Sequence, residues 1–132
     1  MPGKAAVSTG DAPRSTGTHS QAIKANGFVF LTGQTGRNPE TGELEQGLEA
    51  QTRRVLSNVE AILEAAGCSQ ADIVRVVLLM ERIEDFKAID DIYRAWLPPR
   101  EEVPYPVRTA SGGMQLPAGA KLLLEVTALE PQ

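Results

Sequence analysis

Cysteine and histidine are almost absent from this sequence, which has one of each among its 132 residues. The single thiol, Cys68, cannot form a disulfide within the chain, so the cysteine content gives no indication of secretion. Cys68 and His19 also lie far apart in the sequence, which argues against a dedicated zinc site. We therefore expect a cytoplasmic protein with an inert Cys68 thiol and no bound metal.

Basic runs and long apolar runs are missing as well. The chain has 13 Lys and Arg against 17 Asp and Glu, a net charge of −4, and its longest basic run is Arg53-Arg54. A domain that binds nucleic acid usually carries a basic stripe, and the average field of this chain repels a phosphate backbone. The apolar runs are too short to cross a bilayer, and the N-terminal segment lacks the apolar stretch of a signal peptide. The sequence thus predicts neither a nucleic-acid nor a membrane partner.

Hydrophobic periodicity predicts a single α+β domain over residues 1–132, of which about 1–10 are expected to form a mobile tail. Asn26-Gly27 indicates a β-hairpin, Gly67 is placed to cap a long helix, and Pro98-Pro99 ends a second helix. The expected order is β-β-α-β-α-β-β, with two helices on one face of a sheet. The strands are expected near 21–25, 28–32, 73–80, 107–110 and 121–129, and the helices near 47–66 and 83–97.

Two of the expected strands, 73–80 and 122–129, carry apolar residues on both of their faces. Two helices are enough to cover one face of the sheet only. A monomer rarely exposes an apolar sheet face of this size. The pattern therefore predicts a closed oligomer in which other subunits cover the second face.

Arg108 and Glu125 are the candidates for chemistry. Glu125 interrupts an apolar strand on the face it shares with Leu123 and Thr127, where a carboxylate either pairs with a cation or has a function. One interpretation is a structural ion pair between Arg108 and Glu125 on neighbouring strands. The other is an Arg108 fork that binds a substrate carboxylate, beside a Glu125 that holds a water molecule. The spacing alone does not choose between them.

Other polar and aromatic residues have two interpretations each. Thr32-Gly33 ends a strand, and Gly33 is either a turn glycine or a point where backbone N–H groups meet an anion. His19 lies in a polar segment where exposure to solvent is the default. Tyr93 and Trp96, three residues apart on a helix, fit core positions better than a ligand platform.

These residues belong to a longer series of motifs, which covers the chain from about Ala12 to Leu129. By the order and spacing of these motifs, the sequence resembles the RidA/YjgF family of reactive-intermediate deaminases, also described as L-PSP endoribonucleases. The motifs include Leu31-Thr32-Gly33-Gln34, Asn38-Pro39-Glu40-Thr41-Gly42, Asn58 through Gly67, Pro106-Val107-Arg108 and Leu124-Glu125-Val126.

The resemblance implies a chorismate-mutase-like, RidA-like fold and a homotrimer whose sheets form a central barrel, with a cleft between each two subunits. In the family, the residue that matches Arg108 binds the carboxylate of a 2-imino acid, and the residue that matches Glu125 is associated with the attacking water. Thr32 and Gly33 match the pocket wall. The implied products are a 2-keto acid and ammonia, formed without a metal or organic cofactor.

Several positions around the expected cleft differ from those of many relatives. His19 replaces a tyrosine, Asp90 an asparagine and Ala110 a cysteine, and the two glycines of residues 111–114 are expected to loosen that segment. We expect His19, Asp90 and Tyr93 to line the substrate site. These differences concern the identity of the substrate more than the fold.

The leading hypothesis is therefore hydrolysis of a reactive imine or enamine that carries a carboxylate. One alternative is a specialised pathway enzyme with a divergent substrate. Another is a non-catalytic trimer that binds a small carboxylate. An endoribonuclease is disfavoured because the chain is acidic and lacks a basic groove.

Overall fold

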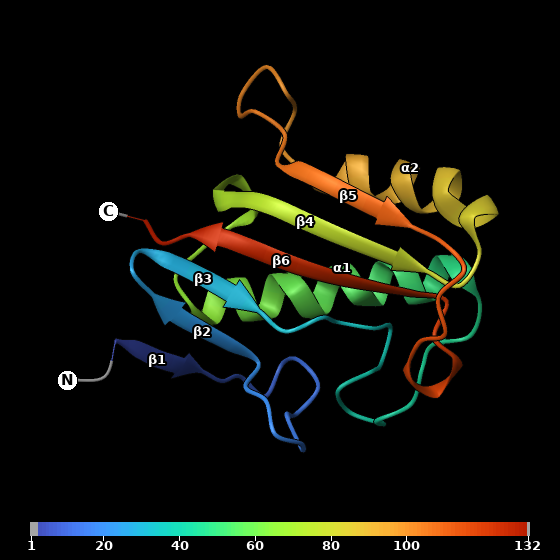
Figure 1. The fold of residues 1–132 in the computed structure, drawn as a ribbon, viewed down its shortest axis with the longest axis horizontal. Helices are drawn as coiled ribbons and strands as arrows, with labels where there is room; N and C mark the ends of the chain where they lie inside the picture. Colours follow the sequence, from blue (N-terminus) through green and yellow to red (C-terminus); the bar gives the residue numbers. More distant parts are fainter. Residues whose placement is uncertain (1–2, 132) are drawn as a thin grey trace.

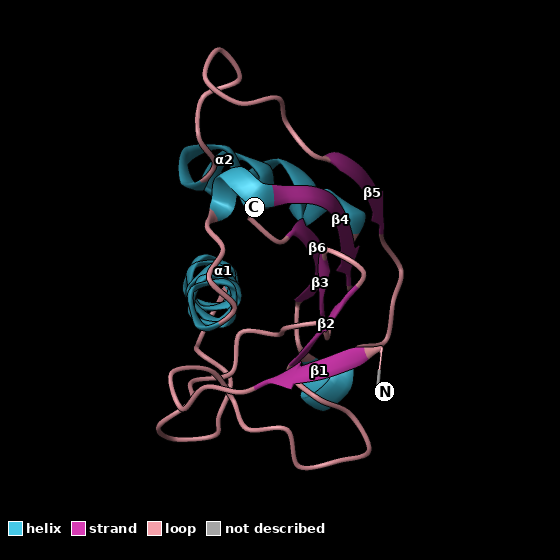
Figure 2. Cartoon of the chain, turned by 90° about the vertical axis from the view of Figure 1, so that its left-hand side faces the viewer, coloured by secondary structure: helices cyan, strands magenta, loops and turns pink. Residues whose placement is uncertain are grey.

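The computed structural model describes residues 3–131, which form one sheet with two helices packed on one of its faces (Figures 1 and 2). The predicted α+β class and the placement of both helices on one face are confirmed. Three short 3-10 turns, η1 (Gln70–Asp72), η2 (Ile83–Asp85) and η3 (Pro117–Gly119), lie between the larger elements. Those are β1 (Lys4–Val7), β2 (Ala22–Ala25), β3 (Phe28–Leu31), α1 (Leu48–Ala65), β4 (Ile73–Met80), α2 (Phe86–Trp96), β5 (Val107–Ser111) and β6 (Leu122–Leu129).

The strand β6 follows every other strand in the sequence and yet lies in the middle of the sheet. The spatial order is β1-β2-β3-β6-β4-β5, so β6 is hydrogen-bonded to β3 on one side and to β4 on the other. All neighbouring strands are antiparallel except β4 and β5, which are parallel. This order leaves β1 at one edge of the sheet and β5 at the other.

The strand β1 was not predicted, and it corrects the expectation of a mobile tail over residues 1–10. Residues 4–7 pair antiparallel with β2, and Val7 is buried. The buried side chain of Gln21 holds the segment that follows, because its Oε1 accepts from the Thr9 N–H (2.7 Å) and its Nε2 donates to the carbonyl of Pro13 (2.8 Å). Backbone pairing with β2 therefore orders a segment whose own composition favours no structure. Met1 and Pro2 lie outside the described residues.

The predicted turns have the backbone conformations that their sequences favour. Asn26 (φ 52°) and Gly27 (φ 83°) both lie in the left-handed region, as the two-residue hairpin between β2 and β3 requires. Gly67 (φ 82°) follows the end of α1 and reverses the chain there. The hairpin and the helix cap are therefore confirmed.

The hydrophobic core lies between the helices and the sheet. Alternate residues of β4 and β6 point toward the helices, and Val76 and Val126 have no exposed surface. Val59 and Ile62 of α1 meet them and are also fully buried. Within residues 3–131, no helix has the length and apolar character needed to cross a membrane.

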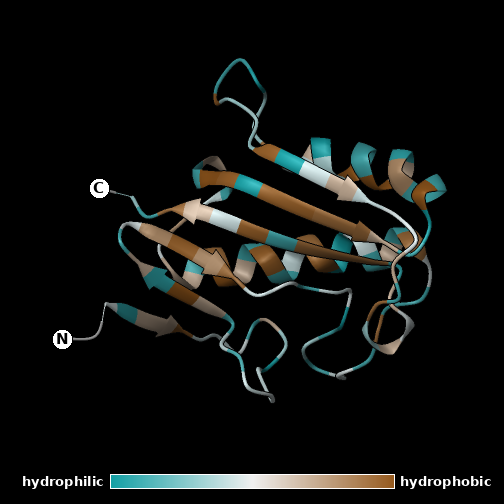
Figure 3. Cartoon of the chain, viewed as in Figure 1, coloured by the Kyte–Doolittle hydropathy of each residue, from teal (hydrophilic) through white to brown (hydrophobic). Residues whose placement is uncertain are grey.

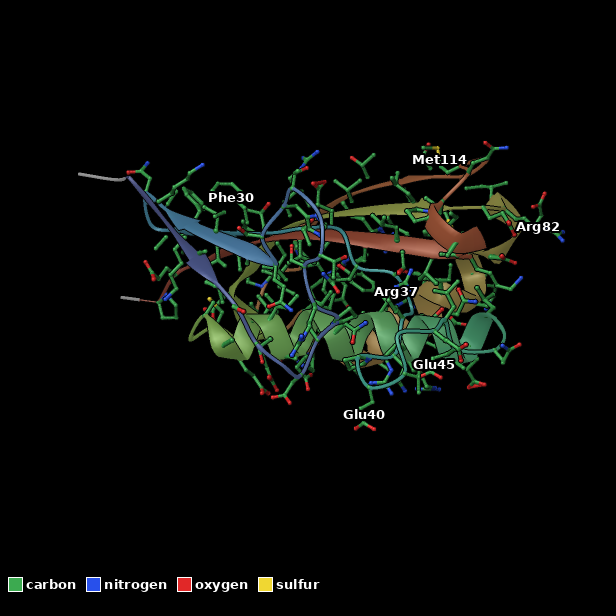
Figure 4. The ribbon with its side chains drawn as sticks, turned by 90° about the horizontal axis from the view of Figure 1, so that it is seen from below. Phe30, Arg37, Glu40, Glu45, Arg82 and Met114 are labelled. Carbon is green, nitrogen blue, oxygen red and sulfur yellow. The ribbon has the colours of Figure 1, made fainter. Side chains whose placement is uncertain are left out.

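The second face of the sheet is uncovered in the single chain and is largely apolar. Phe30 is 46% exposed and Val107 is 62% exposed, although both are strand residues. Figure 3 shows the hydrophobic colour along β3, β6 and β4, and Figure 4 shows Phe30 on the side of the sheet away from α1. The structure thus contains the apolar face that the sequence predicted.

Candidate functional site

Arg108 lies on the edge strand β5, with its side chain on the helix-covered side of the sheet. It is paired in register with the buried Val76 of β4, and side chains that are paired in register share a face. Its Nη1 donates to Oδ1 of Asp90 on α2 (2.6 Å). Its guanidinium carbon lies 5.0 Å from the ring centre of Phe86 and 5.5 Å from that of Tyr93. The Arg108 side chain is therefore held in place by one carboxylate and two aromatic rings.

Asp90 binds two arginines. Its second oxygen, Oδ2, accepts from Nη2 of Arg94 one turn further along α2 (3.1 Å). The side chain of Asp90 is only 15% exposed and that of Arg108 is 29% exposed. The three side chains together carry one net positive charge. An incoming anion consequently meets an Arg108 whose charge is partly balanced by Asp90.

Tyr93 is buried directly beside Arg108. Burial raises the pKa of its phenol to about 12, and the nearby Arg108 opposes this effect less strongly. Because the phenol keeps its proton at neutral pH, Tyr93 is neither a nucleophile nor a base there. The structure thus places Tyr93 both in the core and against Arg108, so the two interpretations of this residue are not exclusive.

A cleft of about 290 Å³ opens next to Arg108. Sequence reasoning missed three of the residues that line it, Arg94, Arg100 and Tyr105. The sequence offered no signal for the two arginines, because Arg94 and Arg100 are spaced no more closely than the other Lys and Arg of the chain. The lining residues include Asp90, Tyr93, Arg94, Arg100, Tyr105 and Arg108.

Glu125 lies on the opposite face of the sheet from Arg108. It is paired with Val77 of β4, whereas Arg108 is paired with Val76, and consecutive residues of a strand point to opposite faces. The strand β4 also separates β5 from β6. The interpretation of Arg108 and Glu125 as an ion pair within one chain is therefore wrong, and Asp90 is the carboxylate that Arg108 binds.

His19, Thr32 and Gly33 line a separate, larger pocket of about 620 Å³, formed by the loops around residues 13–21 and 32–42. A Cβ added to Gly33 would stand 2.6 Å from a methyl carbon of Leu123 on β6, so a larger residue here would require the Leu123 side chain to move. His19 is exposed. The same pocket is lined by Arg14 and Arg37, and sequence reasoning missed both.

Buried amides and an ion pair hold the loop that forms one wall of this pocket. Asn58 of α1 has no exposed surface, and its Nδ2 donates to the carbonyls of Thr35 (3.2 Å) and Arg37 (2.9 Å). The Arg54 guanidinium donates a hydrogen bond to the carboxylate of Glu45 (2.9 Å). This bond, together with a weaker one from the Asn38 side chain, lowers the pKa of Glu45. Figure 4 shows Arg37, Glu40 and Glu45 on the α1 side of the sheet. The loop is therefore fastened to α1 at both ends.

Within one chain the predicted site residues form two separate groups, one in the Arg108 cleft and one in the pocket formed by the loops 13–21 and 32–42, called here the loop pocket. Arg108, Asp90 and Tyr93 line the cleft beside α2, whereas His19, Thr32 and Gly33 line the loop pocket. Leu123, which lines the loop pocket, is on the same sheet face as Glu125. Glu125 itself lines neither the Arg108 cleft nor the loop pocket.

The segment 111–114 is tied down, contrary to the expectation that its glycines loosen it. The N–H groups of Gly113 and Met114 donate to the carbonyls of Glu81 (3.2 Å) and Met80 (3.0 Å). A Cβ on Gly112 would stand 2.7 Å from the backbone of Ile83. The two glycines allow close packing and a positive φ of 77° at Gly113, so they permit a tight turn rather than motion.

The remaining candidates are structural. Cys68 is buried, and burial raises the pKa of its thiol, which disfavours the reactive thiolate. The Trp96 indole donates to the Glu60 carboxylate (3.1 Å) and so links α2 to α1. Among residues 3–131, no three His, Cys, Asp or Glu side chains are grouped as metal ligands would be.

Comparison with known proteins identifies the family. The model of the family described as Endoribonuclease L-PSP matches residues 9–130. The chain is 39% identical to Reactive Intermediate Deaminase A, chloroplastic, of Arabidopsis thaliana, over 95% of this chain and 65% of that protein. It is 31% identical to a 2-iminobutanoate/2-iminopropanoate deaminase of Capra hircus, over 94% of this chain and 88% of that protein.

The fold comparison agrees. The crystal structure of RidA from the Antarctic bacterium Psychrobacter superposes with a TM-score of 0.88, at 36% identity, over 95% of this chain and 98% of that chain. The RidA-like fold predicted from the motifs is therefore confirmed. Because the family model covers nearly the whole chain, the protein belongs to the Endoribonuclease L-PSP family, which is the RidA/YjgF family that its motifs indicated.

Proposed function

We propose that this protein hydrolyses reactive 2-imino acids, and the enamines that tautomerise to them, to a 2-keto acid and ammonia. Water adds to the imine carbon, the carbon–nitrogen bond breaks, and the nitrogen leaves with protons taken from the water and the medium. No oxidant or reductant is needed. Arg108 carries the proposal, because its guanidinium is held over two aromatic rings beside an open cleft. Relatives named as a reactive intermediate deaminase and as a 2-iminobutanoate/2-iminopropanoate deaminase support it.

In this proposal Arg108 binds the carboxylate of the substrate. Aromatic rings contact the flat face of a guanidinium and leave its N–H groups free in the plane, where they match the two oxygens of a carboxylate. Asp90 occupies Nη1 only, according to the hydrogen bonds of the described residues. Arg108 therefore retains donors for a substrate.

We also propose that a second copy of the chain completes the site, within a homotrimer. The Arg108 cleft and the loop pocket are separate in one chain, and the apolar face that carries Glu125 has no cover. Burying Phe30 and its neighbours against another subunit is favourable, at about 25 cal/mol for each Å² of apolar surface removed from water. Packing around that face would bring the Glu125 side of one subunit toward the Arg108 edge of the next.

The roles of the other residues follow from this arrangement. Glu125 would orient or deprotonate the attacking water, and Thr32 and Gly33 would form the wall against which the imine lies. His19 would offer a hydrogen-bond donor where many relatives have a phenol. Imines hydrolyse in water without a catalyst, so positioning of the water and the substrate accounts for most of the required acceleration.

The test is a competition for freshly formed imine. An amino-acid oxidase with catalase generates the imine from 2-aminobutanoate, and semicarbazide traps whatever the protein does not hydrolyse. Active protein lowers the trapped fraction, and Arg108→Ala restores it. The matched control is Arg82→Ala, since Arg82 is an exposed arginine whose nearest carboxylate partner is Glu84 (3.6 Å). An unchanged trapped fraction with folded wild-type protein would exclude the proposal.

Two other functions are distinguished with the same preparation. Cleavage of RNA, to which the family's description refers, is disfavoured by the net charge of −4 and is measured directly on a labelled transcript. A non-catalytic carboxylate-binding trimer would bind 2-oxobutanoate without any effect on the trapped fraction.

A further inference from the structure

We infer that Arg100 forms a second anion subsite in the Arg108 cleft, so that the preferred substrates are dicarboxylic 2-imino acids. This inference rests on the proposed function, because it names the substrate class of the same site. Arg100 and Arg108 line one cleft together with Tyr105 and Tyr93. Neither the sequence motifs nor the names of the relatives assign a role to Arg100.

The charge around the cleft exceeds what one carboxylate needs. Asp90 binds both Arg94 and Arg108, and this trio carries one net positive charge for the first carboxylate of a substrate. Arg100 adds a further positive charge, and no carboxylate of residues 3–131 forms an ion pair with it. The cleft lining therefore carries two net positive charges in a chain whose net charge is −4. That excess favours a ligand with two negative charges.

The side chain of Arg100 is presented in a defined position. Its guanidinium carbon lies 4.7 Å from the ring centre of Tyr105, which repeats the stacking of Arg108 over Phe86 and Tyr93. The backbone around Arg100 is a turn in which the N–H groups of Glu102 (2.9 Å) and Val103 (3.1 Å) both donate to the carbonyl of Pro99. An arginine that is stacked and carried on a closed turn loses little freedom when it binds an anion.

The size of the cleft limits the ligand. Its volume of about 290 Å³ is just below the range for small-molecule sites, about 300–1,000 Å³. A four- or five-carbon diacid is a small ligand of this kind, with its 2-carboxylate on Arg108 and its distal carboxylate on Arg100. The imino forms of acidic amino acids have this chemistry.

Binding of two keto acids of equal length isolates the second charge. The dissociation constants of 2-oxoglutarate and 2-oxopentanoate are measured by calorimetry, and we expect the diacid to bind about fivefold more tightly, as one partly exposed ion pair allows. Arg100→Gln, which removes the charge and leaves a shorter, polar side chain, should reduce this ratio to near one. Arg100→Lys should restore part of it, and Arg82→Gln, which changes an exposed arginine outside the cleft, should leave it unchanged.

Turnover of the corresponding imines separates this inference from the proposed function. The imines of glutamate and norvaline are generated by oxidases, and the ratio of their kcat/KM values should fall in Arg100→Gln by the same factor as the binding ratio. Hydrolysis of both imines with a ratio that Arg100→Gln does not change would overturn the subsite and leave the deaminase standing. A binding preference that depends on Arg100, without hydrolysis of either imine, would support the subsite and overturn the deaminase.

Discussion

The ion pair between Asp90 and Arg108 allows a sharp test of the anion site. We expect Asp90→Asn to raise kcat/KM for monocarboxylic imines, chiefly by lowering KM. An asparagine keeps an oxygen that accepts from Arg108 and has nearly the same shape, so the guanidinium should stay where it is. What changes is the negative charge, which in the wild type stands 2.6 Å from the guanidinium nitrogen that faces it.

The size of the effect follows from that geometry. A carboxylate bound on Arg108 would lie about 5 Å from the carboxylate of Asp90, where the repulsion is about 3 kcal/mol at an effective dielectric constant of 20 and below about 1 kcal/mol in water. The side chain of Asp90 is mostly buried, but Arg94 also binds it and offsets part of its charge. We therefore expect Asp90→Asn to strengthen binding of the substrate carboxylate by about 1–2 kcal/mol, which lowers KM by roughly five- to thirtyfold.

The measurements are the dissociation constant of 2-oxobutanoate, by calorimetry, and kcat/KM for the matching imine. The control is Asp91→Asn, the adjacent residue of α2, whose carboxylate is exposed and bonds to Lys87 (3.1 Å). Asp91→Asn should change neither quantity by more than about twofold. If Asp90→Asn weakened binding instead, the carboxylate would be required to hold Arg108, and the argument from charge repulsion would be refuted.

The other predictions address separate features. Arg108→Lys should lower kcat/KM by a factor that corresponds to about 2–4 kcal/mol of transition-state stabilisation, because lysine lacks the paired donors of arginine, and the circular dichroism spectrum should not change. Equal activity of this variant would contradict the binding of a substrate carboxylate by Arg108. Phe30→Asp should shift the mass measured by light scattering from three chains to one, since it puts a charge on the uncovered face. In an alkaline titration, Tyr93→Phe should remove the tyrosinate absorbance that appears near pH 12. Between about pH 10 and 12 only the unfolded state releases the phenol proton of Tyr93, so the unfolding free energy of the wild type falls as the pH rises, and Tyr93→Phe should lessen that fall. Gly33→Ala should cost about 1–3 kcal/mol of stability, and adding Leu123→Ala should recover part of it if the close approach is the cause.

Local patterns were sufficient to predict the elements that bury a continuous stripe or contain a specific turn. The helix α1 has apolar residues at helical spacing over its whole length and Gly67 after its end, and the hairpin has Asn26-Gly27. The face on which Glu125 lies also followed from alternation along β6. In each case the physical cause acts within a few residues of the sequence.

The features that sequence reasoning missed depend on contacts between distant segments. The strand β1 is ordered by pairing with β2 and by the amide of Gln21, which its own composition does not reveal. The partner of Arg108 was missed because Asp90 is 18 residues away, on a helix whose packing against the sheet edge brings the two together. Gly112 was misread because only the position of Ile83 shows why a side chain cannot fit there.

The central place of β6 has a consequence for how the chain folds. During synthesis, β3 and β4 emerge well before the strand that joins them, so the hairpin of β2 and β3 and the unit of β4, α2 and β5 have no direct sheet contact until β6 is available. Until then both units expose apolar edges, which is the state in which nascent chains aggregate or engage chaperones. Insertion of β6 then closes two interfaces at once, and the long sequence separation of its contact with β3 makes this step slow. Substitutions inside β6 should therefore lower the yield of folded protein more than equally buried substitutions in α1.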